Sequence, residues 1–375
     1  MTKSTSGAGG GLEGIVAGQT AVCTLDGRMS YRGYTIEDLA ARAEYEEVAY
    51  LLLYGELPSA AGLQAFKSRL GAAAELPAPI IDTLRALPAN TSMMDVMRTG
   101  SSMLAHFDAD VADNGREANL RKTERLLARL PLVMAAKHRF DTGRTYADAD
   151  PGRSLAANIL RLVTDREPSR EAEQAMNISL VLYAEHEFNA STFTARCVAS
   201  TLADLHCAIT AAIGALKGPL HGGANERVLE VLEEVGAPDN AESWIRDALA
   251  RKVRIMGFGH RVYKDGDPRT VILTPVCRRL AEATGNQAME QTADVIEKII
   301  VADKKLPANV DWPSARLYYY LGLPVSLYTP LFVCARTAGW AAHAMEQYEN
   351  NRLIRPSAEY TGPALRPFVP LALRG

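Results

Sequence analysis

The chain has 375 residues, 47% of them hydrophobic and 23% charged, which is the composition of a globular protein long enough for roughly two or three domains. Its formal net charge is −3 and it contains no long run of Lys and Arg, so nucleic acid is not expected as a partner. The five cysteines are scattered and form no Cys-x-x-Cys pair, which argues against a disulfide framework and a zinc site and fits a reducing cytoplasm.

The sequence predicts no membrane anchor. Residues 1–11 are rich in Ser and Gly and lack the apolar stretch of a signal peptide, so we expect a flexible tail there. The longest uncharged run, residues 317–335, is interrupted by Gly322, Pro324 and Pro330, which argues against a membrane span. We therefore expect a cytoplasmic protein without a membrane partner.

Strand signals occur only near the start of the chain. Residues 14–25 and 29–31 alternate β-branched residues with Gly and Thr, which predicts a small ribbon. From about residue 35 onward helical periodicity dominates, and Thr35 is placed to cap the first helix.

The rest of the chain is predicted to be helices joined by loops. An apolar-periodic helix within residues 47–54 is stopped by Gly55 and Pro58. Residues 108–119 and 141–153 are rich in Asp, Gly and Pro, which predicts loops between helices. The fold class is therefore all-α with a small N-terminal ribbon.

His221 stands in Gly218-Pro219-Leu220-His221-Gly222-Gly223, directly before a predicted helix at residues 224–235. The positive end of a helix disfavours imidazolium, so this histidine can stay neutral at pH 7 and donate a hydrogen bond to a developing oxyanion. The glycines would let the backbone approach a ligand closely. The alternative is a loop histidine with a structural hydrogen bond.

His260 follows Gly257-Phe258-Gly259, a lone Gly-x-Gly that does not by itself predict a nucleotide site but leaves the backbone accessible. Arg251, Lys252 and Arg254 lie just upstream and could meet phosphates. A solvated basic helix end is the alternative interpretation of this cluster.

Two further polar residues stand in short distinctive settings. His186 lies in Ala184-Glu185-His186-Glu187, and Asp311 precedes Trp312-Pro313. Because Pro313 favours an extended conformation at Trp312, we expect a helix to start near Ser314, where an isolated Asp is also a common cap. Together the three histidines and the aspartate indicate an acid–base site that makes and traps an enolate.

Arg336 lies on a predicted helix for which Thr329 can cap and Pro330 suits the first position. Arg336, Trp340 and His343 share one stripe of that helix, at spacings of four and three residues. An arginine on a largely apolar helix needs an anionic partner, which could be a carboxylate of the fold or of a substrate.

The remaining histidines have no distinctive setting. We interpret them as core histidines: His106, His138, His206 and His343. The chain contains no His-Glu-x-x-His, P-loop or Gly-x-Ser-x-Gly pattern, and no metal site is expected.

The chain resembles citrate synthase, including its close relative 2-methylcitrate synthase, over roughly residues 11 to 365. Six motifs carry the resemblance, because they occur in the order and at the spacing of that family. The motifs are Ala184-Glu185-His186-Glu187, Gly218 to Asn225, Met256 to Tyr263, Asp267-Pro268-Arg269, Asn309-Val310-Asp311 and Ile354-Arg355-Pro356. The resemblance implies an all-helical homodimer with a large domain and a small mobile domain, and an active site between them. It assigns residues 1–222 and 325–375 to the large domain and 223–324 to the small one.

The resemblance also implies chemical roles. Asp311 would remove a proton from the α-carbon of an acyl-CoA, and His221 would stabilise the resulting enol or enolate. His260 would polarise the ketone oxygen of oxaloacetate and donate a proton toward it. Since a carboxylate with an ordinary pKa of about 3.9 is a weak base for a C–H bond, the enolate must be stabilised as it forms.

Further residues would bind the substrates. Oxaloacetate would be held by His186, Arg269 and Arg336, joined by Arg355 from the partner subunit. Coenzyme A would be contacted by residues of one segment: Arg251, Lys252, Ile255, Met256, Gly257, Phe258 and Gly259. No cofactor beyond the coenzyme A thioester is expected.

The acyl group is the open point of this interpretation. Tyr183, three residues before His186, stands where many citrate synthases carry histidine and 2-methylcitrate synthases commonly carry tyrosine. Asp311-Trp312 is also methylcitrate-like, whereas Pro313 matches neither pattern. One methylene is worth only about 1–3 kcal/mol of discrimination, so acetyl-CoA is favoured narrowly and propionyl-CoA, or both, is the alternative.

Two other functions are alternatives. The same helical module serves as a citryl-CoA lyase in larger proteins, and the lack of a CoA-ligase region in the 375 residues argues against it. A non-enzymatic dimer is the second, and the intact Asp311, His221 and His260 argue against that.

Overall fold

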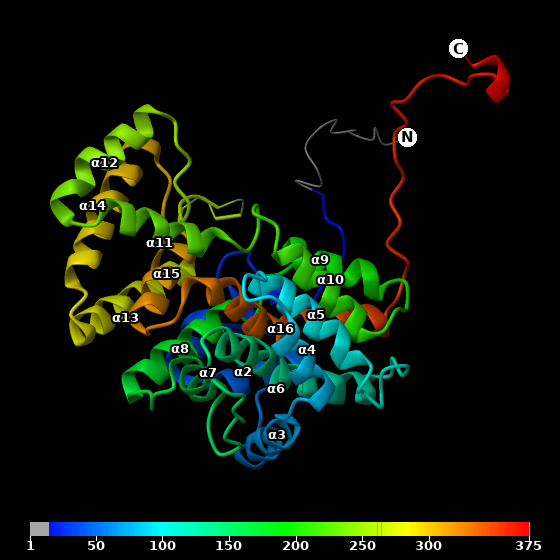
Figure 1. Cartoon of the computed structure of the whole chain (residues 1–375), viewed down its shortest axis with the longest axis horizontal. Helices are drawn as coiled ribbons and strands as arrows, with labels where there is room; N and C mark the ends of the chain where they lie inside the picture. The colour runs from blue at the N-terminus through cyan, green and yellow to red at the C-terminus, as the bar shows by residue number, and fades with distance from the viewer. Residues whose placement is uncertain (1–14, 261, 264, 375) are drawn as a thin grey trace.

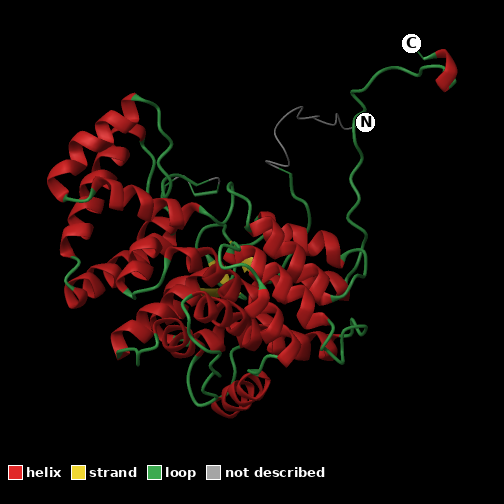
Figure 2. Cartoon of the chain, viewed as in Figure 1, coloured by secondary structure: helices red, strands yellow, loops and turns green. Residues whose placement is uncertain are grey.

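The structure is a computed structural model that describes residues 15–260, 262, 263 and 265–374 (Figure 1). The described part contains sixteen α-helices and one sheet of three two-residue strands (Figure 2). The predicted all-helical class with an N-terminal ribbon is therefore confirmed. The predicted tail at residues 1–11 lies outside the described residues.

The ribbon ties the start of the chain to the segment that carries His186. Its strands β1 (Cys23–Thr24), β2 (Ser30–Tyr31) and β3 (Tyr34–Thr35) are antiparallel in the order β1-β2-β3. The side chain of Tyr31 is buried, and its hydroxyl donates to the carbonyl oxygen of Glu185 at 2.9 Å. The residue before His186 is thus fixed from a point 154 residues earlier in the chain.

The first group of helices follows directly. These helices are α1 (Ile36–Arg42), α2 (Tyr45–Tyr54), α3 (Ala60–Ala73), α4 (Ala78–Ala86), α5 (Met93–Ala105), α6 (Arg116–Asp141), α7 (Leu155–Thr164), α8 (Arg170–Tyr183), α9 (Ala190–Ala199) and α10 (Leu205–Leu216). Thr35 caps α1 as predicted, since its hydroxyl accepts the backbone N–H of Asp38. The predicted helix at residues 47–54 lies within α2, and α6 starts inside the loop predicted for residues 108–119.

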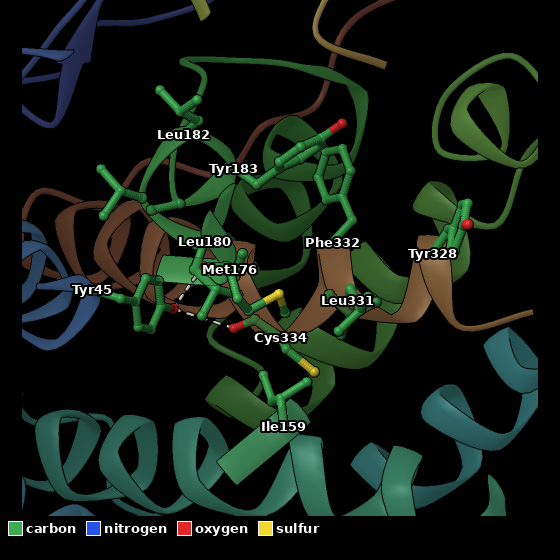
Figure 3. Packing of buried hydrophobic residues seen from close by; sticks show 14 of the residues in the cluster. Tyr45, Ile159, Met176, Leu180, Leu182, Tyr183, Tyr328, Leu331, Phe332 and Cys334 are labelled. Atoms are coloured by element: carbon green, nitrogen blue, oxygen red, sulfur yellow. Dashed lines mark hydrogen bonds between the residues drawn. The ribbon is translucent and has the colours of Figure 1, made fainter. Parts of the chain in front are cut away.

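Helix α16 (Tyr328–Glu349) runs through the middle of this group, after the short 3-10 turn η1 (Val325–Leu327). It packs against α2, α6, α8, α9 and α10, and nearly all of its side chains are buried, including the predicted stripe of Arg336, Trp340 and His343. Figure 3 shows the close packing around it, with Tyr183 of α8 beside Phe332 and the hydroxyl of Tyr45 directed at the carbonyl of Cys334. The charged side chain of Arg336 on this helix therefore lies in the interior of the protein.

Five helices form a second group, which stands apart from the others in Figure 1. They are α11 (Ala224–Val235), α12 (Pro238–Ala250), α13 (Pro268–Thr284), α14 (Gln287–Lys304) and α15 (Asp311–Tyr320). Helix α12 packs on α14, and α15 packs on α11 and α13. The group touches the first one where α13 meets α8 and α1, and where α11 meets α16.

Three sequence expectations were wrong. Helix α15 begins at Asp311 rather than near Ser314, because the missing N–H of Pro313 lies in the first turn, where it would have had no helical partner. Thr329 does not cap α16, whose cap residue is Leu327; its hydroxyl instead contacts the carbonyl oxygen of Gly222. His106 is exposed at the end of α5 rather than buried in the core.

The chain ends in an extended segment, residues 350–374, that leaves the helical body (Figure 1). Apart from the 3-10 turn η2 (Leu371–Leu373), it contains no regular structure. Large apolar side chains on it are exposed, among them Leu353, Tyr360, Leu365 and Phe368. No helix in the described part of the chain is long and apolar enough to cross a membrane.

Candidate active site

The predicted site residues come from five separate places in the fold. His186 lies between α8 and α9, His221 before α11, His260 in the loop between α12 and α13, Asp311 at the start of α15, and Arg336 within α16. The two helix groups therefore both contribute to the site.

Asp311 is held by Tyr183, the last residue of α8. The Tyr183 hydroxyl donates to Asp311 Oδ1 at 2.9 Å and lies 2.8 Å from the hydroxyl oxygen of Ser314. Burial raises the pKa of Asp311 to about 6, although the hydrogen bond from Tyr183 and the charge of Arg269 oppose that rise. A carboxylate with a raised pKa is a stronger base than an ordinary one and is still largely ionised at pH 7.

His221 sits in a tight turn that only glycine allows at the next position. A Cβ at Gly222 would overlap the carbonyl oxygen of Leu216 and press on the side chain of Thr329. The turn brings the imidazole against Phe332, with ring centroids 6.1 Å apart. Burial, helped by the positive charge of Arg336, lowers the pKa of His221 to about 4.

The imidazole of His221 is therefore neutral at pH 7, as predicted, but through burial rather than through the helix terminus. Its Nε2 receives the backbone N–H of Ser191 at 3.3 Å and lies 2.8 Å from the hydroxyl of the same residue. That hydroxyl is fixed by the indole N–H of Trp340, at 3.1 Å. Because Nε2 is the acceptor, the ring hydrogen is assigned to Nδ1, which is left as the donor.

His186 and His260 face each other, with ring centroids 5.2 Å apart at an angle of 69°. Nδ1 of His260 accepts the backbone N–H of Val262 at 3.1 Å, which assigns the ring hydrogen to Nε2. Nε2 of His186 lies 3.1 Å from the hydroxyl of Tyr263. Burial and the nearby charge of Arg269 lower the pKa of His186 well below its usual value, so this imidazole is neutral too.

Arg269 is paired before any substrate arrives. Its Nε and Nη2 donate to the two carboxylate oxygens of Asp267 at 2.9 and 2.7 Å, and both residues are buried. Asp267 Oδ2 also accepts the backbone N–H of Val310 at 3.1 Å. The ion pair therefore joins the start of α13 to the residue before Asp311.

Arg336 is different, because the fork of its guanidinium is open. Its Nε donates to the carbonyl oxygen of Tyr183 at 2.6 Å, and its Cζ lies 4.7 Å from the centre of the Phe332 ring. Nη1 and Nη2 are buried and have no hydrogen-bond partner among the described residues. A buried cation with two unused donors is a site for a carboxylate, which would accept two parallel hydrogen bonds.

The segment predicted to contact coenzyme A is joined to the segment that precedes Asp311. Gly259 N–H donates to the carbonyl oxygen of Pro307 at 2.8 Å, and Asn309 N–H donates to that of Gly257 at 2.9 Å. Gly257 has φ +89°, and a Cβ there would press on Val228 and on Trp312. The ring of Phe258 lies against Trp312, with centroids 4.6 Å apart.

The other predicted binding residues are less enclosed. Arg251 is exposed and paired with Asp247 at 2.8 Å, Lys252 is exposed, and Ile255 and Met256 are half-buried. Arg355 is exposed on the C-terminal segment, and the structure shows no contact between it and the described site residues of its own chain. It is therefore the one predicted oxaloacetate ligand that the single chain does not bring to the site.

Sequence reasoning missed several neighbours of the site. Ser191 beside His221 carries no pattern that marks it. Asp267 belongs to the motif Asp267-Pro268-Arg269, but its ion pair with Arg269 was not predicted. The sequence marks Tyr183 only in connection with the acyl group and does not predict its contact with Asp311. His343 is buried as predicted, but its Nε2 donates to Glu185 Oε1 at 2.9 Å, so it is more than a packing residue.

Comparison with known proteins identifies the family of the chain. The family model described as "Citrate synthase, C-terminal domain" matches residues 11–357. The chain is 43% identical to 2-methylcitrate synthase of Shewanella oneidensis over 100% of both proteins, and 45% identical to citrate synthase 2 of Bacillus subtilis over 97% of this chain and 98% of that protein.

A solved structure resembles the whole chain. It is the ternary complex of citrate synthase from Thermoplasma acidophilum with carboxymethyl coenzyme A and oxaloacetate, with a TM-score of 0.92 and 33% identity over 97% of this chain and 98% of that one. A family match over most of the chain, relatives above 40% identity and a shared fold lead to one conclusion: the chain belongs to the citrate synthase family.

Proposed function

We propose that this protein is a citrate synthase, an acyltransferase that condenses acetyl-CoA with oxaloacetate and water to give citrate and coenzyme A. Membership of the family supports the enzyme class and both substrates, and it supports the absence of any cofactor beyond the coenzyme A thioester. The observation that carries the proposal is the open, buried fork of Arg336, whose Nε donates to the carbonyl oxygen of Tyr183, the residue whose hydroxyl contacts Asp311. The charge of Arg336 also helps to keep the imidazoles of His186 and His221 neutral.

The first step is removal of a proton from the α-carbon of the thioester. Asp311 is the base, because burial raises its pKa to about 6, which makes it a stronger base than an ordinary carboxylate while most of it is still ionised at pH 7. His221 donates from Nδ1 to the thioester oxygen and stabilises the negative charge that develops there. A neutral donor suits an enolate because it can share or give its proton as the charge forms.

The second step is attack of the enolate carbon on the ketone of oxaloacetate. One carboxylate binds in the fork of Arg336, and His186 and Arg269 complete the binding site. His260 donates from Nε2 to the ketone oxygen, which becomes the hydroxyl of the product. Water then hydrolyses the thioester of the condensed product and releases coenzyme A, which draws the reaction forward.

We infer that helices α11 to α15 form the small domain, residues 223–324, and that it moves against a large domain of residues 1–222 and 325–375. Few helices join the two groups, which supports this division. Closure would bring the coenzyme A segment, residues 255–259, over the site and exclude water during the condensation. Arg251 and Lys252, which are exposed, would meet the phosphates of coenzyme A.

We also infer that the protein is a homodimer in which Arg355 of one chain reaches the site of the other. The C-terminal segment extends away from the helical body of its own chain (Figure 1) and exposes several large apolar side chains. Both features support contact with a second copy. In this arrangement Arg355 binds a carboxylate of oxaloacetate across the interface. The proposed location of the dimer is the cytoplasm.

The second candidate function is 2-methylcitrate synthase, which uses propionyl-CoA. Tyr183 favours it, because it stands where many citrate synthases carry histidine and 2-methylcitrate synthases commonly carry tyrosine, and its hydroxyl contacts the proposed base. Acetyl-CoA remains the narrow preference, and the lyase and non-enzymatic alternatives are less favoured, because the acid–base residues come together in one place.

Release of free thiol tests the proposal. The purified protein is mixed with oxaloacetate and either acetyl-CoA or propionyl-CoA, and the organic acid formed is identified. A higher kcat/KM with acetyl-CoA supports citrate synthase, and a higher value with propionyl-CoA makes the protein a 2-methylcitrate synthase. No oxaloacetate-dependent thiol with either thioester would refute both functions.

A further inference from the structure

Glu185 and His343 belong to a buried polar network that has no part in the mechanism above. Glu185, the residue before His186, has an exposed fraction of 0%, and so does His343 on α16. Glu185 Oε1 accepts a hydrogen bond from His343 Nε2 at 2.9 Å. A fully buried carboxylate is costly, so its place in the fold calls for a reason.

The direction of the hydrogen bonds in this network is fixed by an arginine. Arg196 Nη1 donates to His343 Nδ1 at 3.1 Å and to Glu346 Oε2 at 2.6 Å. Arginine has no acceptor, so Nδ1 of His343 must accept and its Nε2 must carry the ring hydrogen. His343 therefore accepts a hydrogen bond from Arg196 at Nδ1 and donates one to Glu185 from Nε2. We call this hydrogen bond to Glu185 the tether.

Glu185 and Arg336 carry opposite charges and are both buried, yet they form no ion pair in the part of the chain that the structure describes. Both Nη atoms of Arg336 lack a partner, and so does Glu185 Oε2. Glu185 is nevertheless the leading charge that supports the protonated form of Arg336 against burial. The carboxylate thus acts on the guanidinium through space without occupying its fork.

The backbone of α16 explains why Glu185 stays where it is. A Cβ at Gly339 would overlap Glu185 Oε2 and the carbonyl oxygen of Ala184. Gly339 lies between the turns of α16 that carry Arg336 and His343, at spacings of three and four residues, so it faces the same side. The carboxylate is packed into the notch that this glycine leaves, and His343 holds it there.

We propose that Glu185 is a positioning residue that serves as a tethered counter-charge for Arg336: His343 and the notch at Gly339 keep it out of hydrogen-bonding reach, so that the guanidinium fork stays open for a carboxylate of the substrate. The identity of that substrate, oxaloacetate, rests on the proposed function. A direct Glu185–Arg336 ion pair would neutralise the guanidinium equally well but would compete with the substrate for the same donors.

The proposal predicts opposite effects for two substitutions, measured as the Kd of oxaloacetate by calorimetry and as Tm with and without the ligand. Glu185→Gln keeps the shape and removes the counter-charge. Arg336 then depends on the substrate for neutralisation, so we expect the Kd to fall at least about threefold, the Tm of the free protein to fall, and the rise in Tm on adding oxaloacetate to grow.

His343→Leu removes the tether but leaves the charge. The freed Glu185 can turn to Arg336 and occupy its fork, so we expect the Kd of oxaloacetate to rise about tenfold or more. His343→Gln places an amide donor near the position of Nε2 and is expected to stay within about twofold of wild type. In the double variant with Glu185→Gln the loss caused by His343→Leu disappears, because no carboxylate is left to compete.

Glu46→Gln is the matched control, since Glu46 is another buried carboxyl, on α2, that accepts a backbone N–H from Leu155 at 2.7 Å and lies outside the site. It should leave the Kd unchanged. If Glu185→Gln raises the Kd of oxaloacetate as His343→Leu does, Glu185 merely supports the fold locally and the proposal is wrong. The Kd of Glu185→Gln is sufficient for this test even if the His343→Leu variant fails to fold. If the wild type itself binds no oxaloacetate, the proposed function is wrong, whereas normal binding by the wild type with the wrong order of effects among the variants refutes the counter-charge alone.

Discussion

Replacing Tyr183 by phenylalanine removes the hydroxyl that donates to Asp311 at 2.9 Å while keeping the ring against Phe332. The hydrogen bond stabilises the carboxylate and lowers a pKa that burial has raised to about 6. A hydrogen bond to a charged group is worth about 1.5–3 kcal/mol, and one pKa unit corresponds to 1.36 kcal/mol. We therefore expect the pKa of Asp311 in the variant to rise by about one to two units.

The sign of the effect on activity follows from which form of Asp311 is the base. The carboxylate is active, so kcat/KM is lost as the pH falls through the pKa, near pH 6 in the wild type. In Tyr183→Phe this acid limb moves upward, and at pH 7 the ionised fraction falls from about 0.9 to between about 0.5 and 0.1. Activity should recover as the pH approaches about 9.

The assay is kcat/KM for the acyl-CoA between about pH 5 and pH 9, at saturating oxaloacetate. Tyr318→Phe is the matched control, because its hydroxyl lies 2.7 Å from that of Ser179 and makes no hydrogen bond with Asp311. Its acid limb should coincide with that of the wild type. An acid limb that is unchanged in Tyr183→Phe would refute Asp311 as the titrating base.

Three further outcomes are expected. Arg336→Met removes two charge-assisted hydrogen bonds to the substrate of about 1.5–3 kcal/mol each. The KM of oxaloacetate should therefore rise at least about a hundredfold, while the KM of the acyl-CoA changes little. An equal effect on both KM values would argue against the fork as the carboxylate site. Gly222→Ala forces a Cβ against the carbonyl of Leu216, so the free energy of unfolding should fall by about 1–3 kcal/mol in a denaturant titration and kcat should fall as His221 is displaced; a variant with wild-type stability and kcat would contradict the close approach. Arg355→Ala should raise the KM of oxaloacetate at least about tenfold, and mixing it with an inactive Asp311 variant should restore part of the activity only if the arginine acts across a dimer.

The helical class could be predicted because local patterns set it. Helix α11 was predicted with its observed bounds, since the apolar spacing of residues 224–235 and the glycines on either side leave few alternatives. The start of α15 was missed because a proline in a first turn looks the same in sequence as a proline that precedes a helix. The cap of α16 was missed because tertiary contact draws the Thr329 hydroxyl to Gly222 instead.

Residue types in polar, glycine-rich settings pointed to the histidines and to Asp311, since core packing does not require them there. Their partners could not be predicted, because contacts such as Tyr183 with Asp311, 128 residues apart, depend on how helices pack rather than on any local pattern. The neutral state of His221 was predicted for one reason and has another, because burial depends on the whole fold. Long-range neighbours, rather than the reactive groups themselves, are what the structure adds.

The most direct test of the account is thiol release by the purified wild type and by Asp311→Asn in parallel, with acyl-CoA, in the presence and absence of oxaloacetate. We expect release that depends on oxaloacetate in the wild type, and less than about a hundredth of that rate in a variant that remains folded, because the side-chain amide cannot accept the α-proton. Release by Asp311→Asn at a rate near that of the wild type, or no release by the wild type with either thioester, would contradict the account.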